Sequence, residues 1–259
     1  MSGLILERQP ALRRPILILA FAGWNDAGQA ATNAVRFAAE QLTATPFARV
    51  DPDEFYDFTV LRPQVRLAEG AQRTIDWNTL EVRAAQVPAV AHDFAFGWGP
   101  EPHLKWKAFC TLMLDLVREC DASMVVTLGG YLAEVLYSRP VPVTGFSTEP
   151  ELLRHLDVGA TRYEGPTGIV GVLAEHCRAA GLRHASLWAA LPHYIAAAPN
   201  PRASLALLLR LCDLVQLPID LQPLQDAAAA FEQQVTEAIN GDPKLSAYVR
   251  ELKRREFAH

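Results

Sequence analysis

Two titratable side chains lie in segments that follow apolar runs, where an acid or a base could act. Asp26 comes after the run PILILAF, and His193 comes after the run ASLWAAL. Open α/β sheets bind ligands outside the carboxyl ends of their strands, and histidine is readily poised for proton transfer near neutral pH. Asp26 is therefore a candidate acid, base or ligand contact, with Trp24 as an apolar wall. The alternatives are that Asp26 or Asn25 caps the following helix and that His193 is structural.

A glycine-rich segment, residues 164–171 (EGPTGIVG), is a candidate for anion binding. Its glycines stand at every third position at the start of a predicted helix, where free backbone N–H groups and the helix dipole favour an anion. The segment is not the G-x-G-x-x-G dinucleotide fingerprint, and it lacks the lysine of a phosphate loop. The alternative is a helix capped by Thr167, whose glycines allow close packing.

Two adjacent glycines, Gly129 and Gly130, follow a predicted strand at residues 124–128. They suit either a tight turn or the close approach of the backbone to a ligand. Together with the segments above they define one candidate pocket, in which no catalytic residue is assigned. Its residues are Trp24, Asn25, Asp26, Gly129, Gly130, Glu164, Gly165, Thr167, Gly168, His193 and Tyr194.

Searches for other functional motifs exclude several classes of site. There is no G-x-S-x-G nucleophile elbow, because residues 145–149 (GFSTE) lack the second glycine. None of the seven histidines falls into H-E-x-x-H or another ligand spacing, so we expect neither a metal nor a cofactor. The net charge is -5, and the basic residues 253–255 lie in a predicted last helical turn, where cations complement the dipole. We therefore expect no nucleic-acid partner.

The four cysteines are widely spaced in the sequence, which is typical of buried thiols in a reducing compartment. No apolar stretch reaches the roughly 18–20 residues that span a bilayer. The first residues do not resemble an export signal. We therefore expect a cytoplasmic protein with no membrane partner.

Helical and strand patterns alternate along the first 220 residues, which predicts an α/β core domain at residues 1–220. Its strands are continuous apolar runs, typical of strands buried on both faces, so residues 17–19, 125–126 and 187–188 should be largely buried. Strands are expected at residues 15–21, 89–94, 124–128, 141–146 and 185–191. Helices are expected at residues 27–42, 103–120, 168–180 and 201–215.

A β-rich insertion at about residues 54–95 interrupts this alternation. Short strand-like segments are expected at residues 54–61, 65–68 and 73–77, with a hairpin turn at residues 69–72. From residue 221 to residue 259 only helices are expected, forming a C-terminal helical hairpin. Asn240-Gly241 ends its first helix, and Asp242-Pro243 provides a cap and a first residue for the second.

Four blocks of the sequence resemble the proteasome assembly chaperone 2 family, in the form typical of actinobacterial members. They occur in the family's order at residues 21–31 (FAGWNDAGQAA), 56–66 (YDFTVLRPQVR), 164–173 (EGPTGIVGVL) and 188–194 (WAALPHY). The resemblance implies an α/β fold similar to that of purine nucleoside phosphorylases, with a mixed central sheet flanked by helices. It also implies self-association, for which a trimer is the first expectation.

The same resemblance bears on possible partners. Eukaryotic members of the family help to assemble the proteasome α-ring, whereas actinobacterial members have no settled activity. Some archaeal relatives dock on the proteasome through a C-terminal tripeptide of a hydrophobic residue, tyrosine and any residue. This chain ends Phe257-Ala258-His259, which keeps the hydrophobic residue and lacks the tyrosine, so the sequence does not predict proteasome docking.

Two functions of different classes remain. The first is a non-catalytic protein-binding or assembly factor that acts as a homo-oligomer. Its interface would use apolar residues of the insertion, such as Phe55, Phe58 or Trp77, or of the C-terminal helices. The second is a small-molecule enzyme on a nucleoside-phosphorylase-like scaffold. The lack of a readable nucleophile, metal set or cofactor loop favours the first.

Overall fold

The computed structural model describes residues 3–67, 73–156, 158–161 and 163–257. The predicted hairpin turn at residues 69–72 and the last two residues of the chain lie outside the described residues. Within the described part, no helix is both long and apolar enough to cross a membrane.

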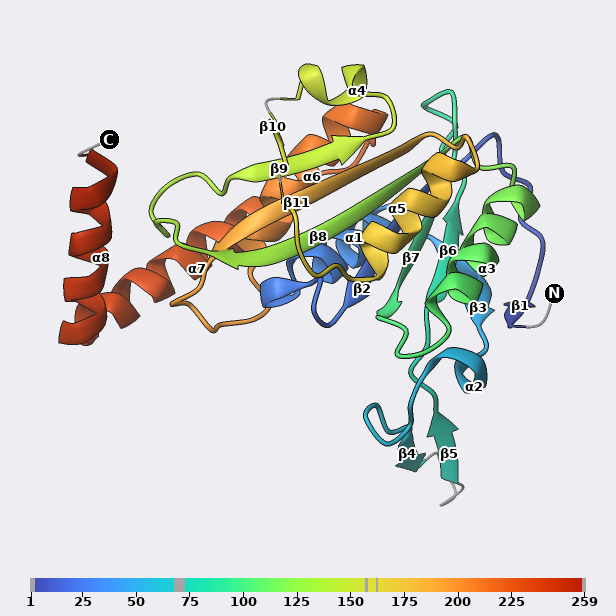
Figure 1. Cartoon of the computed structure of the whole chain (residues 1–259), viewed down its shortest axis with the longest axis horizontal. Coiled ribbons are helices and arrows are strands. Elements are labelled where there is room, and N and C mark those ends of the chain that lie inside the picture. Colours follow the sequence, from blue (N-terminus) through green and yellow to red (C-terminus); the bar gives the residue numbers. More distant parts are fainter. Residues whose placement is uncertain (1–2, 68–72, 157, 162, 258–259) are drawn as a thin grey trace.

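A mixed nine-stranded sheet forms the centre of the molecule (Figure 1). Its four middle strands run parallel, and the strands outside them are mostly antiparallel to their neighbours. In spatial order the strands are β1 (Leu4–Leu6), β3 (Thr45–Val50), β6 (Glu81–Ala85), β7 (Phe94–Pro100), β2 (Ile16–Ala22), β8 (Met124–Ala133), β11 (His184–Pro192), β9 (Val143–Ser147) and β10 (Gly159–Ala160). The carboxyl ends of β7, β2, β8 and β11 therefore meet at one edge of the sheet.

Helices cover both faces of this sheet. The helices are α1 (Ala30–Gln41), preceded by the short 3-10 turn η1 (Ala27–Gln29), α2 (Pro52–Phe55), α3 (Trp106–Glu119), α4 (Glu151–Arg154), α5 (Ile169–Ala179), α6 (Pro201–Val215), α7 (Gln222–Gly241) and α8 (Pro243–Phe257). Helices α1 and α6 pack on one face, and α3 and α5 pack on the other. An α/β fold with a mixed central sheet, flanking helices and C-terminal helices is thus confirmed.

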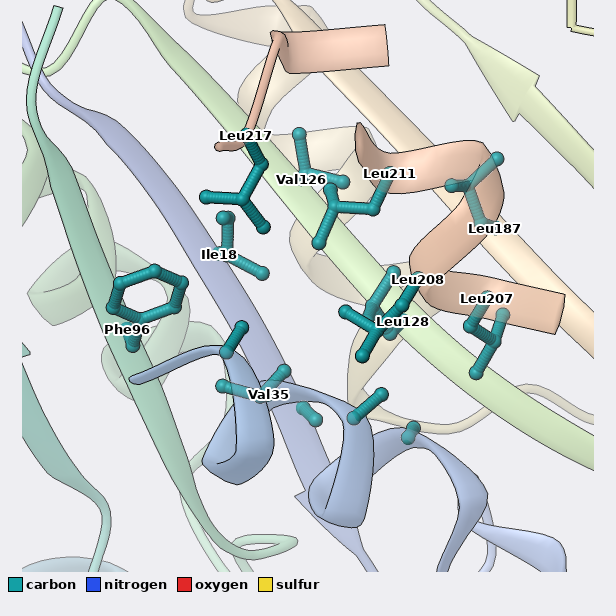
Figure 2. Close-up of a cluster of buried hydrophobic side chains, with 14 of the residues drawn as sticks. Ile18, Val35, Phe96, Val126, Leu128, Leu187, Leu207, Leu208, Leu211 and Leu217 are labelled. Atoms are coloured by element: carbon teal, nitrogen blue, oxygen red, sulfur yellow. The ribbon is translucent and has the colours of Figure 1, made fainter. Parts of the chain in front are cut away.

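The core on the α1–α6 face is shown in Figure 2. Ile18 and Val126 of neighbouring strands pack against Leu208 and Leu211 of α6 and Val35 of α1. Because successive strand residues point to opposite faces, Leu17 and Val125 belong to the other core, beneath α3 and α5. The predicted core is confirmed, with the qualification that Trp188 is only half-buried.

The insertion differs most from its prediction. Residues 54–61 do not form a strand: Asp51 caps the short helix α2, accepting from the Asp53 backbone N–H at 3.2 Å, and turns follow it. Strands β3 and β6 were not predicted, because each carries arginine or proline among its residues. The predicted strand at residues 89–94 lies further along the chain, at Phe94–Pro100.

A two-stranded sheet formed by β4 (Gln64–Leu67) and β5 (Arg73–Asp76) projects from the body beyond α2 (Figure 1). This confirms the predicted pairing of these segments, and every residue of both strands is exposed. Phe55 is instead buried, with its ring centre 5.3 Å from that of Phe109. Phe55 is therefore not available to an interface, contrary to the prediction.

The C-terminal helices leave the sheet at the end opposite to this hairpin (Figure 1). Helix α7 packs along α6, and α8 packs on α7 around a small cluster of Tyr137, Val235, Ile239 and Val249. Asp242 caps α8 as predicted, because its carboxylate accepts the backbone N–H groups of Lys244 and Leu245 at 2.8 and 3.1 Å.

Candidate functional site

A buried cluster at the carboxyl ends of the parallel strands joins two of the predicted loops. The Asn25 side chain is fully buried, and its Nδ2 donates to Oε1 of Glu101 at 2.7 Å. The same carboxylate oxygen accepts the backbone N–H of Ile169, the first residue of α5, at 2.7 Å. One acidic side chain thus ties the loop after β2 to the start of α5. We call Asn25, Glu101, Gly168 and Ile169 the strand-end cluster.

Glu101 was missing from the sequence prediction. It directly follows β7, but the expected strand ended at residue 94, so this carboxylate did not stand at a predicted strand end. The segment Gly-Trp-Gly-Pro-Glu at residues 97–101 could have indicated this role of Glu101. An acidic residue after a parallel strand can reach the N-terminus of a neighbouring helix.

The anion site predicted at the start of α5 is occupied by this internal carboxylate. Glu101 accepts a first-turn N–H and places a negative group at the positive end of the helix dipole. Gly168 is the N-cap residue, in an extended conformation with φ of -95°. Thr167 is not the predicted cap, because its hydroxyl contacts the carbonyl of Gly168 at 3.4 Å and no helical N–H donates to it.

Gly168 is needed for packing in the strand-end cluster. A Cβ atom at this position would lie 2.6 Å from Nδ2 of Asn25 and 2.7 Å from Oε1 of Glu101. Real Cβ atoms do not approach polar atoms this closely, so any side chain here would displace Asn25 or Glu101. Gly168 thus allows the start of α5 to pack closely on Asn25 and Glu101, as in the alternative in which the glycines serve close packing.

Asp26 holds the start of α1. Its carboxylate accepts the backbone N–H groups of Ala31 at 2.7 Å and Thr32 at 3.3 Å, and the Thr32 hydroxyl at 2.5 Å. Burial raises the pKa of Asp26 above its ordinary value, and the hydrogen bonds from Thr32 and Ala31 oppose that rise. The capping alternative therefore describes what this side chain does in the structure.

Gly129 and Gly130 do not form a turn, because β8 continues through both to Ala133. A Cβ atom on Gly129 would lie 2.5 Å from the Trp188 ring of the neighbouring strand β11. The backbone N–H of Gly130 donates to the carbonyl of Asn25 at 2.8 Å, which continues the sheet into the loop after β2. The space that the two glycines leave is filled by protein.

His193 and Tyr194 directly follow β11 and belong to a second group of side chains, which contacts α8. Nδ1 of His193 lies 3.1 Å from the Ala133 carbonyl oxygen, and its Nε2 lies 3.2 Å from the Tyr248 hydroxyl. The Tyr194 hydroxyl accepts the backbone N–H of Tyr137 at 2.9 Å. Ala133 is three residues beyond Gly130, about 10 Å along an extended strand. His193 is therefore too far along the sheet to share a proton directly with the groups at Gly130.

The remaining predicted residues lie at the surface. Trp24 is 61% exposed, so it does not wall an enclosed pocket. Glu164 is exposed as well, and Gly165 packs against the ring of Tyr163, whose hydroxyl donates to the Pro166 carbonyl at 2.9 Å. Of the predicted pocket, the structure brings together Asn25, Asp26, Gly130 and Gly168.

The chemistry open to these groups is limited by their partners. Among the residues that the structure describes, no group of three or more His, Cys, Asp and Glu side chains could hold a metal ion. The Asp26 and Glu101 carboxylates each accept hydrogen bonds from backbone N–H groups of a helix. The strand-end cluster thus ties the loop after β2 to the start of α5, and Asp26 holds the start of α1.

Comparison with known proteins identifies the family. The PAC2 family model matches residues 20–239. The fold is similar to a PAC2 family protein from Streptomyces avermitilis, at 41% identity and a TM-score of 0.83, covering 91% of this chain and 99% of that one. It is also similar to a proteasome-assembly chaperone homologue from Mycobacterium tuberculosis, at 38% identity and a TM-score of 0.82, covering 90% of this chain and 99% of that one.

More distant likeness extends to archaea. An archaeal proteasome activator from Pyrococcus furiosus shares the fold at 19% identity, with a TM-score of 0.72 over 92% of this chain and 99% of that one. No curated protein matches the chain. The family match covers most of the sequence, including all four blocks on which the resemblance rested. The chain therefore belongs to the PAC2 family.

Proposed function

We propose that this protein is a non-catalytic protein-binding or assembly factor that acts as a homo-oligomer, with a trimer as the first expectation. The observation that carries the proposal is the apolar face of the β4–β5 hairpin. Val65 and Ile75 lie directly opposite each other on the two strands. Leu67 lies two residues further along β4 on the same face, opposite Arg73, and Trp77 directly follows the end of β5.

This face is open to solvent in the single chain. Val65 is 59% exposed, Leu67 73%, Ile75 54% and Trp77 43%. The opposite face of the hairpin is polar, with an ion pair between Arg66 and Asp76. A two-stranded sheet is marginally stable unless something packs against it, and exposed apolar patches mark interaction sites. The hairpin thus has the form of an interface element.

The hydrogen bonds of the Asp26 and Glu101 carboxylates support the non-catalytic part of the proposal. An acid or base needs a free position toward a substrate, whereas Asp26 and Glu101 are hydrogen-bonded to helix N-termini. The relative from M. tuberculosis is described as a proteasome-assembly chaperone homologue, which is consistent with a protein-binding role. Proteasome docking is not part of the proposal.

The test is sedimentation velocity on the full chain from 1 to about 100 μM, with wild type compared with a hairpin variant, Val65→Lys/Ile75→Glu. The introduced charges lie opposite each other, so the strands remain paired while the apolar face is lost. We expect an oligomeric wild type and a monomeric variant. The matched control, Gln64→Lys/Thr74→Glu, places the same charges on the polar face and should stay oligomeric.

A monomeric wild type over this range would refute the proposed oligomer. Turnover of nucleosides or related small molecules at enzymatic rates would refute the non-catalytic assignment and favour the enzyme alternative. The two measurements are independent, so either part of the proposal can fail alone.

A further inference from the structure

Helix α8 lies at one end of the molecule and is joined to α7 by a single residue (Figure 1). Helix α7 ends at Gly241, and α8 begins at Pro243. Proline has no backbone N–H and its ring fixes φ, which disfavours one continuous helix through this point. Gly241 is exposed, and a Cβ atom added to it would meet no other atom within 4 Å. The connection therefore has room to bend.

Helix α8 buries little apolar surface. Within residues 243–256, only Val249 and Leu252 are buried. Val249 packs in the cluster that also contains Tyr137, Val235 and Ile239. Helix α6, which has the same length of 15 residues, buries six. A helix of this length is only marginally stable in water by itself, so α8 depends on the few contacts that it makes.

Two ion pairs join α8 to the connection between β8 and β9. Arg255 pairs with Glu134 at 3.5 Å, and Glu256 pairs with Arg139 at 3.4 Å. Both pairs line a cleft of about 400 Å³ between α8 and this connection. The four side chains are between 45% and 63% exposed. Ion pairs as exposed as these are weak, and salt screens them.

The third contact of α8 with the strand ends is aromatic. The ring of Tyr248 packs edge-on against those of His193 and Tyr194, with ring centres 5.7 and 5.6 Å apart. The Tyr248 hydroxyl lies 3.2 Å from Nε2 of His193, which directly follows β11. This contact fixes the place at which α8 meets the end of that strand. Because His193 is exposed, water can replace the hydrogen bond when α8 moves away.

We propose that α8 is a hinged lid, which closes on the ends of β8 and β11 at low ionic strength and opens at Gly241 as the salt concentration rises. Opening separates both ion pairs and uncovers the cluster in which Val249 packs, including Tyr137 and Ile239. One exposed ion pair changes an equilibrium constant by about two- to five-fold. At 1 M salt the screening length is about 3 Å, so the open population should be roughly five- to twenty-fold larger than at 0.05 M.

Thiol labelling of a Val249→Cys variant tests the lid. Cysteine is close to valine in volume, and Val249 is only 4% exposed, so the introduced thiol is covered while the lid is closed. An uncharged maleimide is used, because salt does not alter its approach to the protein. The labelling rate should rise about five- to twenty-fold between 0.05 and 1 M NaCl. The chain without this substitution gives the background from the native cysteines, of which Cys110 and Cys177 are fully buried.

Matched substitutions in the Val249→Cys protein assign the effect to the ion pairs. Glu134→Gln weakens one contact from the body side and leaves the sequence of α8 unchanged. It should accelerate labelling about two- to five-fold at 0.05 M NaCl and have no effect at 1 M, where the pair is already screened. The control is Glu151→Gln, which breaks an exposed ion pair with Arg154 on α4 and should leave the labelling rate unchanged at both salt concentrations.

Hydrogen exchange on the unaltered chain gives a readout that does not depend on the variants. Once detached, α8 should lose its helical hydrogen bonds, so its amides exchange whenever the lid opens. The amides of α8 should exchange faster than those of α6, and salt should accelerate exchange in α8 alone. Equal exchange rates in the two helices, or exchange and thiol labelling that do not respond to salt, would overturn the inference. An equal effect of Glu134→Gln and Glu151→Gln would do the same.

Discussion

Lowering the pH should destabilise the folded protein through one buried histidine. His184 at the start of β11 is fully buried, with Nε2 3.1 Å from the hydroxyl of Thr127. Its Nδ1 is buried and has no hydrogen-bond partner among the described residues. The ring of Phe146 lies beside it, with 5.5 Å between ring centres. Burial of the cationic form is therefore uncompensated, which lowers the pKa of His184 to about 4.

The sign and size of the effect follow from linkage. The ordinary pKa of 6.5 applies to the unfolded chain, so unfolding takes up a proton between pH 6.5 and about 4. The free energy of unfolding should fall as the pH drops through this window and then level off with respect to this group. At 1.36 kcal/mol per pKa unit the full loss is about 3 kcal/mol, of which about 2 kcal/mol should be reached at pH 4.5.

Urea denaturation of wild type and His184→Gln at pH 7 and pH 4.5 tests this, at one fixed protein concentration. The variant loses stability at both pH values, but the same acidic groups titrate in both proteins. The drop in unfolding free energy on acidification should therefore be about 2 kcal/mol smaller in the variant. Parallel pH profiles, or an NMR titration that places the His184 ring near pH 6.5 in the folded protein, would refute the reasoning.

Three further predictions concern the start of α5. Gly168→Ala should lower the free energy of unfolding, measured by urea denaturation, by about 1–3 kcal/mol, because the new methyl group overpacks against Asn25 and Glu101. The control is Gly241→Ala, where a Cβ meets no atom within 4 Å. A loss of stability no greater than that of the control would contradict the prediction. Thr167→Ala should lower the free energy of unfolding by less than about 0.5 kcal/mol, because the Thr167 hydroxyl accepts no hydrogen bond from a helical N–H. A loss near 1 kcal/mol would indicate that Thr167 does cap the helix. Glu101→Ala should lower the free energy of unfolding by about 1.5–3 kcal/mol, because it leaves Asn25 Nδ2 and the Ile169 N–H without their acceptor. An unchanged midpoint of denaturation would show that water replaces the carboxylate without loss of stability.

The sequence predicted the elements whose signal is local. Strand β2 and helix α6 were placed to within a residue or two, because an unbroken apolar run and a proline at the first helical position are visible without knowledge of the fold. Gly181 directly follows the helix expected at residues 168–180, and its φ of 69° is that of a glycine cap at a helix C-terminus.

The errors arise where a distant segment decides the local structure. Gly97 and Gly99 come after the strand expected at residues 89–94, yet they lie inside β7. Leu19 and the backbone of Leu80 take up the space next to them. Gly129 is similar, since the ring that covers it comes from β11. The sequence alone does not indicate whether a glycine lies in an extended strand or in a turn.

The candidate pocket stays a prediction, and the structure brings only part of its residues together for a related reason. The distance between His193 and Asp26 depends on how far β8 and β11 continue past Gly130. Pairing over nine residues carries His193 to Ala133 and into contact with α8. Strand length beyond a glycine pair is set by the neighbouring strand, which the sequence alone does not show.

The hydrogen bonds of Glu101 have a consequence for the order of folding. They join Glu101 to Asn25 and to Ile169, which are 76 and 68 residues away along the chain. Contacts of such long range form after the local ones, because the entropy of closing the intervening chain is lost first. The strand-end cluster should therefore be absent from the folding transition state. Substitutions at Glu101 or Gly168 should accelerate unfolding and leave the refolding rate nearly unchanged.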